Sequence, residues 1–360
     1  MSRVVPLERE HLPAVADLYQ REVRMSSHPP PAGLVPYFER TLLDHPWADP
    51  ELRSLVFEAD DGAVLGFFGC HVRRLLLDGR PIRMVCAGQL VTHPSARRRG
   101  VGAILVRDLL GGPQDLSITD GATGEVAAIW ERLGGRTRFP ESIVWTRVLR
   151  PARFAGLALE NRGRQRAARL MAPLSEAVDR VARRRSASDS TDSPEELTVP
   201  LLLAEADGLA HGARIRPAYD EAYLEWVFRE MASVQARGEL VRHAVRRQER
   251  VVGSYVAYLP HRGLGQVMQI AATARGLDDV LEDLFDHADR RGVSALQGRL
   301  EPRLFEALSR RRCLLRYSER ALMHSRDAEV QKAVAEDGAL LTRMDGEWWM
   351  GHHLDPLPST

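Results

Sequence analysis

Three consecutive arginines stand directly before two closely spaced glycines in this chain. The run consists of Arg97, Arg98, Arg99, Gly100, Val101, Gly102 and Ala103, between a strand-like stretch at 83–92 and a helix-like stretch at 101–110. A strand that leads through a glycine turn into a helix presents unpaired backbone N–H groups and partial positive charge to an anion. Glycines let the backbone approach a bulky diphosphate, and arginines add charge-assisted hydrogen bonds. The run therefore predicts a phosphate-binding turn.

The spacing does not fit two common phosphate-binding motifs. A P-loop requires Lys and then Ser or Thr after the second glycine, where this chain has Ala103 and Ile104. A dinucleotide-binding fingerprint requires Gly or Ala three residues after Gly102, and Leu105 stands there. Neither motif accounts for the run.

The run resembles motif A of the GNAT N-acyltransferases, Gln/Arg-x-x-Gly-x-Gly/Ala, and the similarity extends outward through Val91, Thr92, His93 and Pro94. This resemblance implies that the turn binds the pyrophosphate of an acyl-coenzyme A and that the end of strand 83–92 pairs with its pantetheine. It further implies that the N–H of Leu90 or Val91 stabilises the thioester oxyanion. The coenzyme-binding residues implied in this way are Gln89, Leu90, Val91, Arg97, Arg98, Arg99, Gly100, Val101, Gly102 and Ala103.

The sequence departs from the family pattern at both usual catalytic positions. The family's glutamate base corresponds to Gly88, and its tyrosine acid, in Tyr-Glu-x-Leu-Gly, corresponds to Trp130. An indole does not protonate a thiolate, so we expect Trp130 to pack or to line the acyl pocket. Asp120, which follows strand 116–119, is our first substitute base, and Glu141 and His93 are further candidates. Each also has a simpler interpretation: Asp120 as a turn residue, Glu141 as a solvated loop acid and His93 as a residue that shapes the turn.

Hydrophobic periodicity and turn residues predict the elements that position these residues. We expect helices at 12–23, 33–43, 101–110 and 126–133, and strands at 54–59, 63–77, 83–92, 116–119 and 143–149. This order is similar to that of the GNAT fold, so the resemblance covers the first 150 residues.

The second half repeats this order without the phosphate-binding motif. An arginine-rich amphipathic stretch at 151–185 and a polar stretch at 186–196 separate the halves. From 197 onward, helices at 201–211 and 221–230 precede strands at 240–246, 251–259 and 266–273 and a helix at 277–288. At the equivalent turn, Ala274, Arg275 and Gly276 replace the glycine pair and the basic cluster. We therefore expect an α/β (α+β) protein with two GNAT-like domains, 1–150 and a degenerate 197–360, each a mixed, mostly antiparallel sheet flanked by helices and joined by a helical linker, 151–196.

Composition excludes several classes of protein. The 50 basic residues are balanced by 49 acidic ones, for a net charge of +1, which argues against a nucleic-acid-binding protein. No run of about 18 apolar residues predicts a membrane span, and no signal peptide is recognisable, so we expect a cytoplasmic protein without a membrane partner. Three scattered cysteines and the pair His352-His353 do not form a metal motif, whereas Trp348 and Trp349 are expected to pack on a core.

The function indicated is N-acyl transfer from acetyl-CoA or another acyl-CoA to a primary amine of a small molecule, by direct attack in a ternary complex. One alternative is a non-catalytic acyl-CoA sensor or scaffold, which the changes at Gly88 and Trp130 favour. Another is aminoacyl transfer from charged tRNA, as in Fem-type tandem proteins, and the intact turn at 97–102 argues against it. The sequence leaves the acceptor, the acyl length and the oligomeric state open.

Overall fold

The computed structural model describes residues 2–160, 195–210, 212–318 and 320–350. Contacts divide the chain into two compact units that alternate along the sequence. Unit 1 is Met1–Ser142, Gly212–Ala236 and Glu319–Thr360, and unit 2 is Ile143–His211 and Arg237–Ser318. These units differ from the contiguous division 1–150, 151–196 and 197–360 that the sequence predicts. Most of the expected linker, 161–194, lies outside the described residues.

Unit 1 contains a mixed sheet of eight strands in the order β1-β2-β3-β4-β5-β15-β6, with β9 paired to β3. Only β4 and β5 pair in parallel, and the other neighbours are antiparallel. The strands are β1 (Arg3–Pro6), β2 (Leu55–Glu58), β3 (Val64–Leu77), β4 (Arg80–Thr92), β5 (Leu116–Ala122), β6 (Arg136–Arg138), β9 (Ile215–Pro217) and β15 (Arg320–His324).

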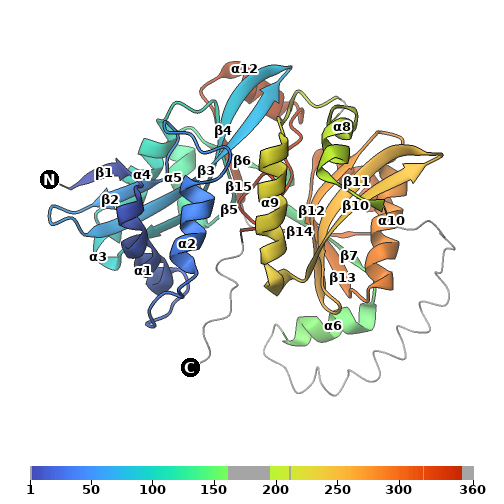
Figure 1. Ribbon diagram of the computed structural model, residues 1–360, viewed down its shortest axis with the longest axis horizontal. Coiled ribbons are helices and arrows are strands. Elements are labelled where there is room, and N and C mark those ends of the chain that lie inside the picture. Colours follow the sequence, from blue (N-terminus) through green and yellow to red (C-terminus); the bar gives the residue numbers. More distant parts are fainter. Residues whose placement is uncertain (1, 161–194, 211, 319, 351–360) are drawn as a thin grey trace. The chain divides into compact units, whose positions relative to one another are not determined.

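Helices cover both faces of this sheet (Figure 1). One apolar cluster joins α4 and α5 to one face, and another joins α1 and α2 to the opposite face. A third cluster includes residues of α12. The helices of unit 1 are η1 (Arg9–His11), α1 (Leu12–Glu22), α2 (Leu34–Phe38), η2 (Glu39–Leu43), α3 (Pro94–Arg97), α4 (Val101–Leu110), α5 (Gly124–Arg132), η3 (Pro140–Ser142), α9 (Glu221–Ser233) and α12 (Ala328–Ala335).

The strand predicted at 143–149 forms, but it belongs to the other sheet. As β7 (Ile143–Val148) it pairs with β13 and β14 in unit 2. In unit 1 the strand beside β5 is β15, from near the C-terminus. Both segments are short and apolar enough to form an inner strand, and such a local pattern does not specify which sheet a strand joins. The prediction that 143–149 is a strand of the first domain is therefore wrong.

Unit 2 is a second mixed, mostly antiparallel sheet of seven strands in the order β14-β7-β13-β12-β11-β10-β8. Its core forms between the sheet and α10 (Leu277–Arg290), η5 (Pro302–Leu304) and α11 (Phe305–Arg310). The other elements are β8 (Glu195–Glu196), β10 (Glu239–Arg247), β11 (Arg250–Leu259), β12 (Leu264–Ala272), β13 (Ala295–Arg299), β14 (Leu314–Tyr317), α6 (Pro151–Glu160) and α8 (Val199–Leu209), with η4 (Gln235–Arg237) at the border of the units. The predicted fold class, two α/β domains of this kind, is confirmed.

The two central strands of unit 1 separate where the predicted site lies. Pairing between β4 and β5 ends at Cys86 and Ile118, so the residues that follow on the two strands are not paired with each other. Just beyond, the register of β3 and β4 shifts between Phe67 and Gly69, and Gln89 takes a positive φ of 58°. This β-bulge bends β4 away from regular pairing. A gap between β4 and β5 therefore opens along residues 87–92 of β4 and 119–122 of β5.

Candidate active site

The predicted phosphate-binding turn connects β4 to α4. His93 caps the short helix α3, accepting a hydrogen bond at Nδ1 from the Ser95 N–H at 3.3 Å, and its ring also contacts the Ser95 hydroxyl at 2.7 Å. The imidazole therefore shapes the turn. Gly100 is the N-cap of α4 and has a φ of 71°, a conformation that a residue with a Cβ adopts only with strain.

Open space lies over the glycines of this turn. Within the described part of the chain, a Cβ added at Gly100 would meet no atom closer than 4 Å. At Gly102 it would meet only Thr92 Cγ2 at 3.8 Å and Leu90 Cδ2 at 4.0 Å, which are ordinary contacts. The chain's own packing therefore does not require glycine at 102. The first N–H groups of α4 lack partners inside the helix, so the turn can receive an anion.

The three arginines have different surroundings. Arg97 forms an ion pair with Glu22 at the end of α1, which fixes the turn against that helix. Arg98 and Arg99 are exposed. Exposed guanidinium groups beside a helix N-terminus are suited to contact the outer phosphates of a polyanionic ligand.

A carboxylate from the far C-terminal part of the chain lies where the strands separate. A Cβ added at Gly88 on β4 would fall only 1.1 Å from Glu347 Oε2, so the Glu347 carboxylate fills the space of a side chain at position 88. From β5, the Thr119 hydroxyl donates to Glu347 Oε1 at 3.0 Å. Asp120 is buried beside them and accepts a long hydrogen bond at Oδ1 from the Glu347 N–H, at 3.4 Å. The sequence predicted Asp120 here but missed Glu347.

Residues 341–350, which we name the C-terminal strap, hold Glu347 in this place. The guanidinium of Arg73, only 1% exposed, donates to the backbone carbonyls of Asp345 at 3.1 Å and Gly346 at 3.4 Å. The buried Asp345 carboxylate accepts hydrogen bonds from Tyr219 at 2.5 Å and from the Thr342 N–H at 2.7 Å. Burial nevertheless raises the pKa of Asp345, against the hydrogen bonds that lower it.

The tryptophan pair singled out in the sequence belongs to this strap. Trp349 is fully buried, packs edge to face on Trp226 of α9 and donates from its indole N–H to the Met344 carbonyl at 3.0 Å. Packing of the pair on a core is thus confirmed for Trp349. His352 and His353 lie outside the described residues.

The strap also faces α1. Tyr19 on α1 is 2% exposed, and burial raises the pKa of its hydroxyl. The negative charge of Glu347 raises the pKa of Tyr19 further, whereas Arg24 lowers it. Tyr19 therefore lies within electrostatic range of both the Glu347 carboxylate and the Arg24 guanidinium.

Trp130 and Glu141, two other residues singled out in the sequence, are held by packing and by ion pairs, respectively. Trp130 is fully buried in the cluster formed with α4, which agrees with a packing role. Glu141 forms an ion pair with Arg138 at 3.2 Å, and Arg138 also binds Asp337 at 2.6 Å. Glu141 is therefore held by ion pairs beside β6 and η3.

The equivalent turn of unit 2 is closed. A Cβ added at Gly276, the N-cap of α10, would lie 2.4 Å from the Val252 carbonyl oxygen, so this turn packs directly on β11. The first turn of α10 carries Asp278, and hydrogen bonds from Arg311 and Arg310 hold the pKa of Asp278 below its usual range. The lack of space at this turn disfavours a diphosphate here.

Two further polar clusters lie apart from the predicted turn. In unit 2, ligand atoms of His243, Asp283 and His287 lie within 4.8 Å of one another, and no ion is present. The Tyr255 hydroxyl lies among them, 2.6 Å from His243 Nδ1 and 2.8 Å from each of the other two, so these groups hydrogen-bond to one another. The buried His243 Nε2 takes no part in this network. Burial lowers the pKa of His287 to about 4.

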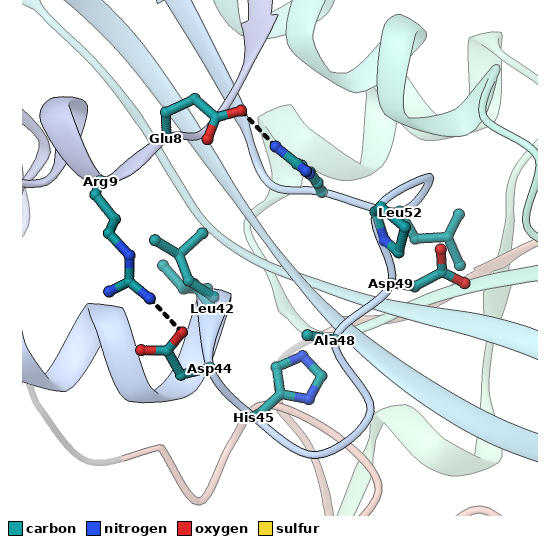
Figure 2. A pocket seen from close by; sticks show the side chains of 11 residues that line it. Glu8, Arg9, Leu42, Asp44, His45, Ala48, Asp49 and Leu52 are labelled. Carbon is teal, nitrogen blue, oxygen red and sulfur yellow. Dashed lines mark hydrogen bonds and ion pairs between the residues drawn. The ribbon is translucent and has the colours of Figure 1, made fainter.

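The second is a cavity of about 290 Å³ in unit 1, shown in Figure 2. The residues that line it are Glu8, Arg9, Leu42, Leu43, Asp44, His45, Ala48, Asp49, Pro50, Leu52 and Arg53. The ion pairs Glu8–Arg53 and Arg9–Asp44 lie at its edge. His45 lines it, and burial lowers the pKa of its imidazole to about 3. None of the residues predicted to bind coenzyme lines this cavity.

Unit 1 is an α/β domain whose central strands separate, with a glycine turn at the opening. Residues 13–114 match the family model described as the acetyltransferase (GNAT) family. This match lies in unit 1 and includes the whole turn. No curated protein matches the sequence.

Solved structures extend the likeness to both units. A probable N-acyltransferase from Enterococcus faecalis has a TM-score of 0.58 at 10% identity, over 90% of this chain and 73% of that one. A GCN5-related N-acetyltransferase from Anabaena variabilis has a TM-score of 0.59 at 11% identity with the same coverage. N-myristoyltransferase from Saccharomyces cerevisiae has a TM-score of 0.51 at 10% identity, over 90% and 79%. At these identities the likeness establishes the fold. Among the described residues, no helix is long and apolar enough to cross a membrane.

Proposed function

We propose that this protein is an N-acyltransferase that moves an acyl group, acetyl in the first instance, from acyl-CoA to a primary amine of a small molecule. The observation that carries the proposal is the open glycine turn of α4 beside separated strands that hold two carboxylates, within a matched GNAT domain. Amide formation from a thioester needs an anchored coenzyme, an oxyanion donor and a site for the amine proton. Unit 1 has a candidate for each.

The coenzyme would bind along β4 and the turn. Residues 97–103 would hold the diphosphate, with Arg98 and Arg99 free of the ion pair that engages Arg97. Residues 89–91 would pair with the pantetheine. Gln89 and Leu90 lie opposite Phe68 in the bulge, outside the regular register, which favours the Leu90 N–H as the oxyanion donor.

The acceptor would approach the carboxylates at the opening of the sheet. Asp120 and Glu347 both lie where β4 and β5 separate, and two negative charges attract an ammonium group more strongly than a neutral or anionic acceptor. This electrostatic preference supports a primary amine. His93 and Glu141 are engaged elsewhere and contribute less to the proposal.

A non-catalytic acyl-CoA sensor is the second candidate. Two residues favour this class. Trp130 stands where the family resemblance places the tyrosine acid, and Gly88 stands where it places the glutamate base. Both classes need the coenzyme turn, so coenzyme binding does not separate them, whereas turnover does. Unit 2, whose turn is closed, would bind no coenzyme in either case.

Titration calorimetry with acetyl-CoA, followed by thiol release in the presence of tyramine, spermidine or glucosamine, tests the proposal. Binding together with amine-dependent thiol release supports N-acyl transfer. Binding without release for any amine favours the sensor. An absence of binding would contradict both.

A further inference from the structure

We infer that Glu347 is the general base of the acyl transfer and that the C-terminal strap is therefore a catalytic element of unit 1. The inference rests on the proposed function and adds a catalytic residue to it. It reassigns Asp120, the base expected from the sequence, as the residue that positions Glu347.

The Glu347 carboxylate occupies the space of a side chain at position 88. The Glu347 Oε2 atom lies 1.1 Å from where a Cβ at position 88 would be, and the carboxyl carbon lies 2.3 Å from it. A side chain at 88 and the Glu347 carboxylate are therefore mutually exclusive. The resemblance to the GNAT family places its glutamate base at position 88, so glycine there makes room for a carboxylate that arrives from elsewhere in the chain.

The carboxylates of Glu347 and Asp120 have different contacts. Glu347 reaches across the opening from β4 to β5, with one oxygen over Gly88 and the other held by Thr119 at 3.0 Å. Asp120 is directed at the strap backbone, because a Cβ at Gly346 would lie 2.0 Å from its Oδ2 and the Glu347 N–H lies 3.4 Å from its Oδ1. Asp120 thus fixes the turn from which Glu347 extends.

Buried side chains hold the C-terminal strap in place on both sides of Glu347. A general base must be held in place to act efficiently. Arg73, Asp345 and Trp349 are all almost completely buried and fix the backbone on either side of Glu347. Glu347 itself is partly exposed, which leaves a path for a proton to solvent.

The acyl transfer begins with removal of a proton from the amine. Glu347 accepts one proton from the substrate ammonium, and the free amine attacks the thioester carbonyl carbon. The C–N bond forms, the tetrahedral intermediate collapses and the C–S bond breaks. The second proton lost by nitrogen passes to the coenzyme A thiolate, so the products are amide, coenzyme A and one proton released from Glu347.

The test compares Glu347→Gln with Asp120→Asn, using acetyl-CoA and whichever of tyramine, spermidine or glucosamine gives the fastest thiol release. We expect Glu347→Gln to lower kcat by about 100-fold or more, the usual contribution of a general base. Its residual rate should rise with pH as the free-amine fraction grows, so the acidic limb of the profile moves upward in pH. Asp120→Asn should lower kcat less than about 10-fold and leave that limb in place. Glu329→Gln, an exposed glutamate of the same C-terminal region, is the matched control.

The two can fail separately. An absence of acetyl-CoA binding by the wild type would overturn the proposed function and this inference with it, whereas wild-type turnover by Glu347→Gln with unchanged acetyl-CoA binding would overturn this inference alone. A relocated carboxylate gives a second test: Gly88→Glu in a Glu347→Ala background should recover at least 10-fold of the activity lost. Three results would each contradict the assignment of Glu347 as the base. Glu347→Gln could turn over as fast as the wild type, or Asp120→Asn could lose more activity than Glu347→Gln and shift the acidic limb of the pH profile. The Gly88→Glu, Glu347→Ala double variant could also recover no activity.

Discussion

The substitution Gly102→Asp separates coenzyme binding from folding, because we expect it to act on the two in opposite directions. Gly102 is the second residue of α4, and a Cβ there makes only ordinary contacts with Thr92 and Leu90. A non-glycine residue lowers the entropy cost of helix formation, and a carboxylate near a helix N-terminus contributes about 0.3–1 kcal/mol. The free energy of unfolding should therefore be unchanged or rise by up to about 1 kcal/mol.

The same carboxylate should repel the diphosphate. Two unit charges about 5 Å apart interact by roughly 3 kcal/mol at an effective dielectric constant of about 20, and a diphosphate carries more than one charge. Even if salt and side-chain movement halve each interaction, about 3 kcal/mol remains in total. This corresponds to an increase in Kd of at least about 100-fold.

Calorimetric titration of acetyl-CoA into the wild type, Gly102→Asp and Gly102→Asn measures the effect. The asparagine variant has nearly the same shape without the charge, so it should bind within about 10-fold of the wild type. Thermal unfolding of the three free proteins checks that the fold is kept. If Gly102→Asp bound acetyl-CoA as tightly as the wild type, the diphosphate would not lie at the start of α4, and the assignment of residues 97–103 would have to be abandoned.

Three further predictions concern the residues around this site and the two neutral histidines. Trp130→Phe should keep kcat within about 3-fold while lowering the unfolding temperature, because the indole fills a core and transfers no proton; a loss of turnover with normal coenzyme binding would contradict this. Arg73→Met should lower both kcat and the free energy of unfolding, the latter by about 1–3 kcal/mol, because it leaves carbonyls of the strap without donors; urea unfolding and thiol release measure the two effects. His45 and His287 have pKa values of about 3 and about 4 in the folded state, against about 6.5 when unfolded, so the unfolded chain binds more protons below pH 6.5. Stability should therefore fall as the pH falls from 6.5 toward 4, by up to about 1.4 kcal/mol per pH unit for each histidine; urea midpoints at pH 7, 6 and 5 measure it, and a His287→Gln variant with the wild-type slope would exclude His287 as a source.

The local parts of the structure could be predicted from the sequence because local physics determines them. The glycine turn, the helix after it and the hairpin before it all follow from glycine positions, turn residues and hydrophobic period. Burial of Trp130 also followed from its chemistry. The roles of Asp120, Glu141 and His93 in catalysis stay predictions.

The partners of strands far apart in sequence could not be predicted in this way. The segments that become β7 and β15 have similar lengths and apolar patterns, and each could complete either sheet. The choice depends on packing against α5, α11 and α12, which only the assembled chain provides. For the same reason no spacing rule linked Gly88 to Glu347.

A signal for Glu347 was nevertheless present in the sequence as two anomalies. Gly88 lacks the carboxylate that the resemblance places there, and Glu347 directly precedes the unusual pair Trp348 and Trp349. A buried tryptophan fixes the segment around it to a core, and a fixed segment can supply a side chain to a site.

The pairing of Gly88 with Glu347 changes how the missing glutamate should be interpreted. A chain that had only lost catalysis could carry any small or apolar residue at 88, and nothing would keep a carboxylate near that position. Here the space of a side chain at 88 is occupied by a carboxylate that Thr119 holds and that the Arg73-bound strap delivers. Removing a carboxylate from water at an opening in the sheet costs free energy, and the hydrogen bond from the Thr119 hydroxyl offsets part of that cost. An uncharged residue at 347 would avoid this desolvation cost. The retained charge therefore favours catalysis over a coenzyme sensor, since only a reaction that removes a proton from the acceptor uses a carboxylate at this point.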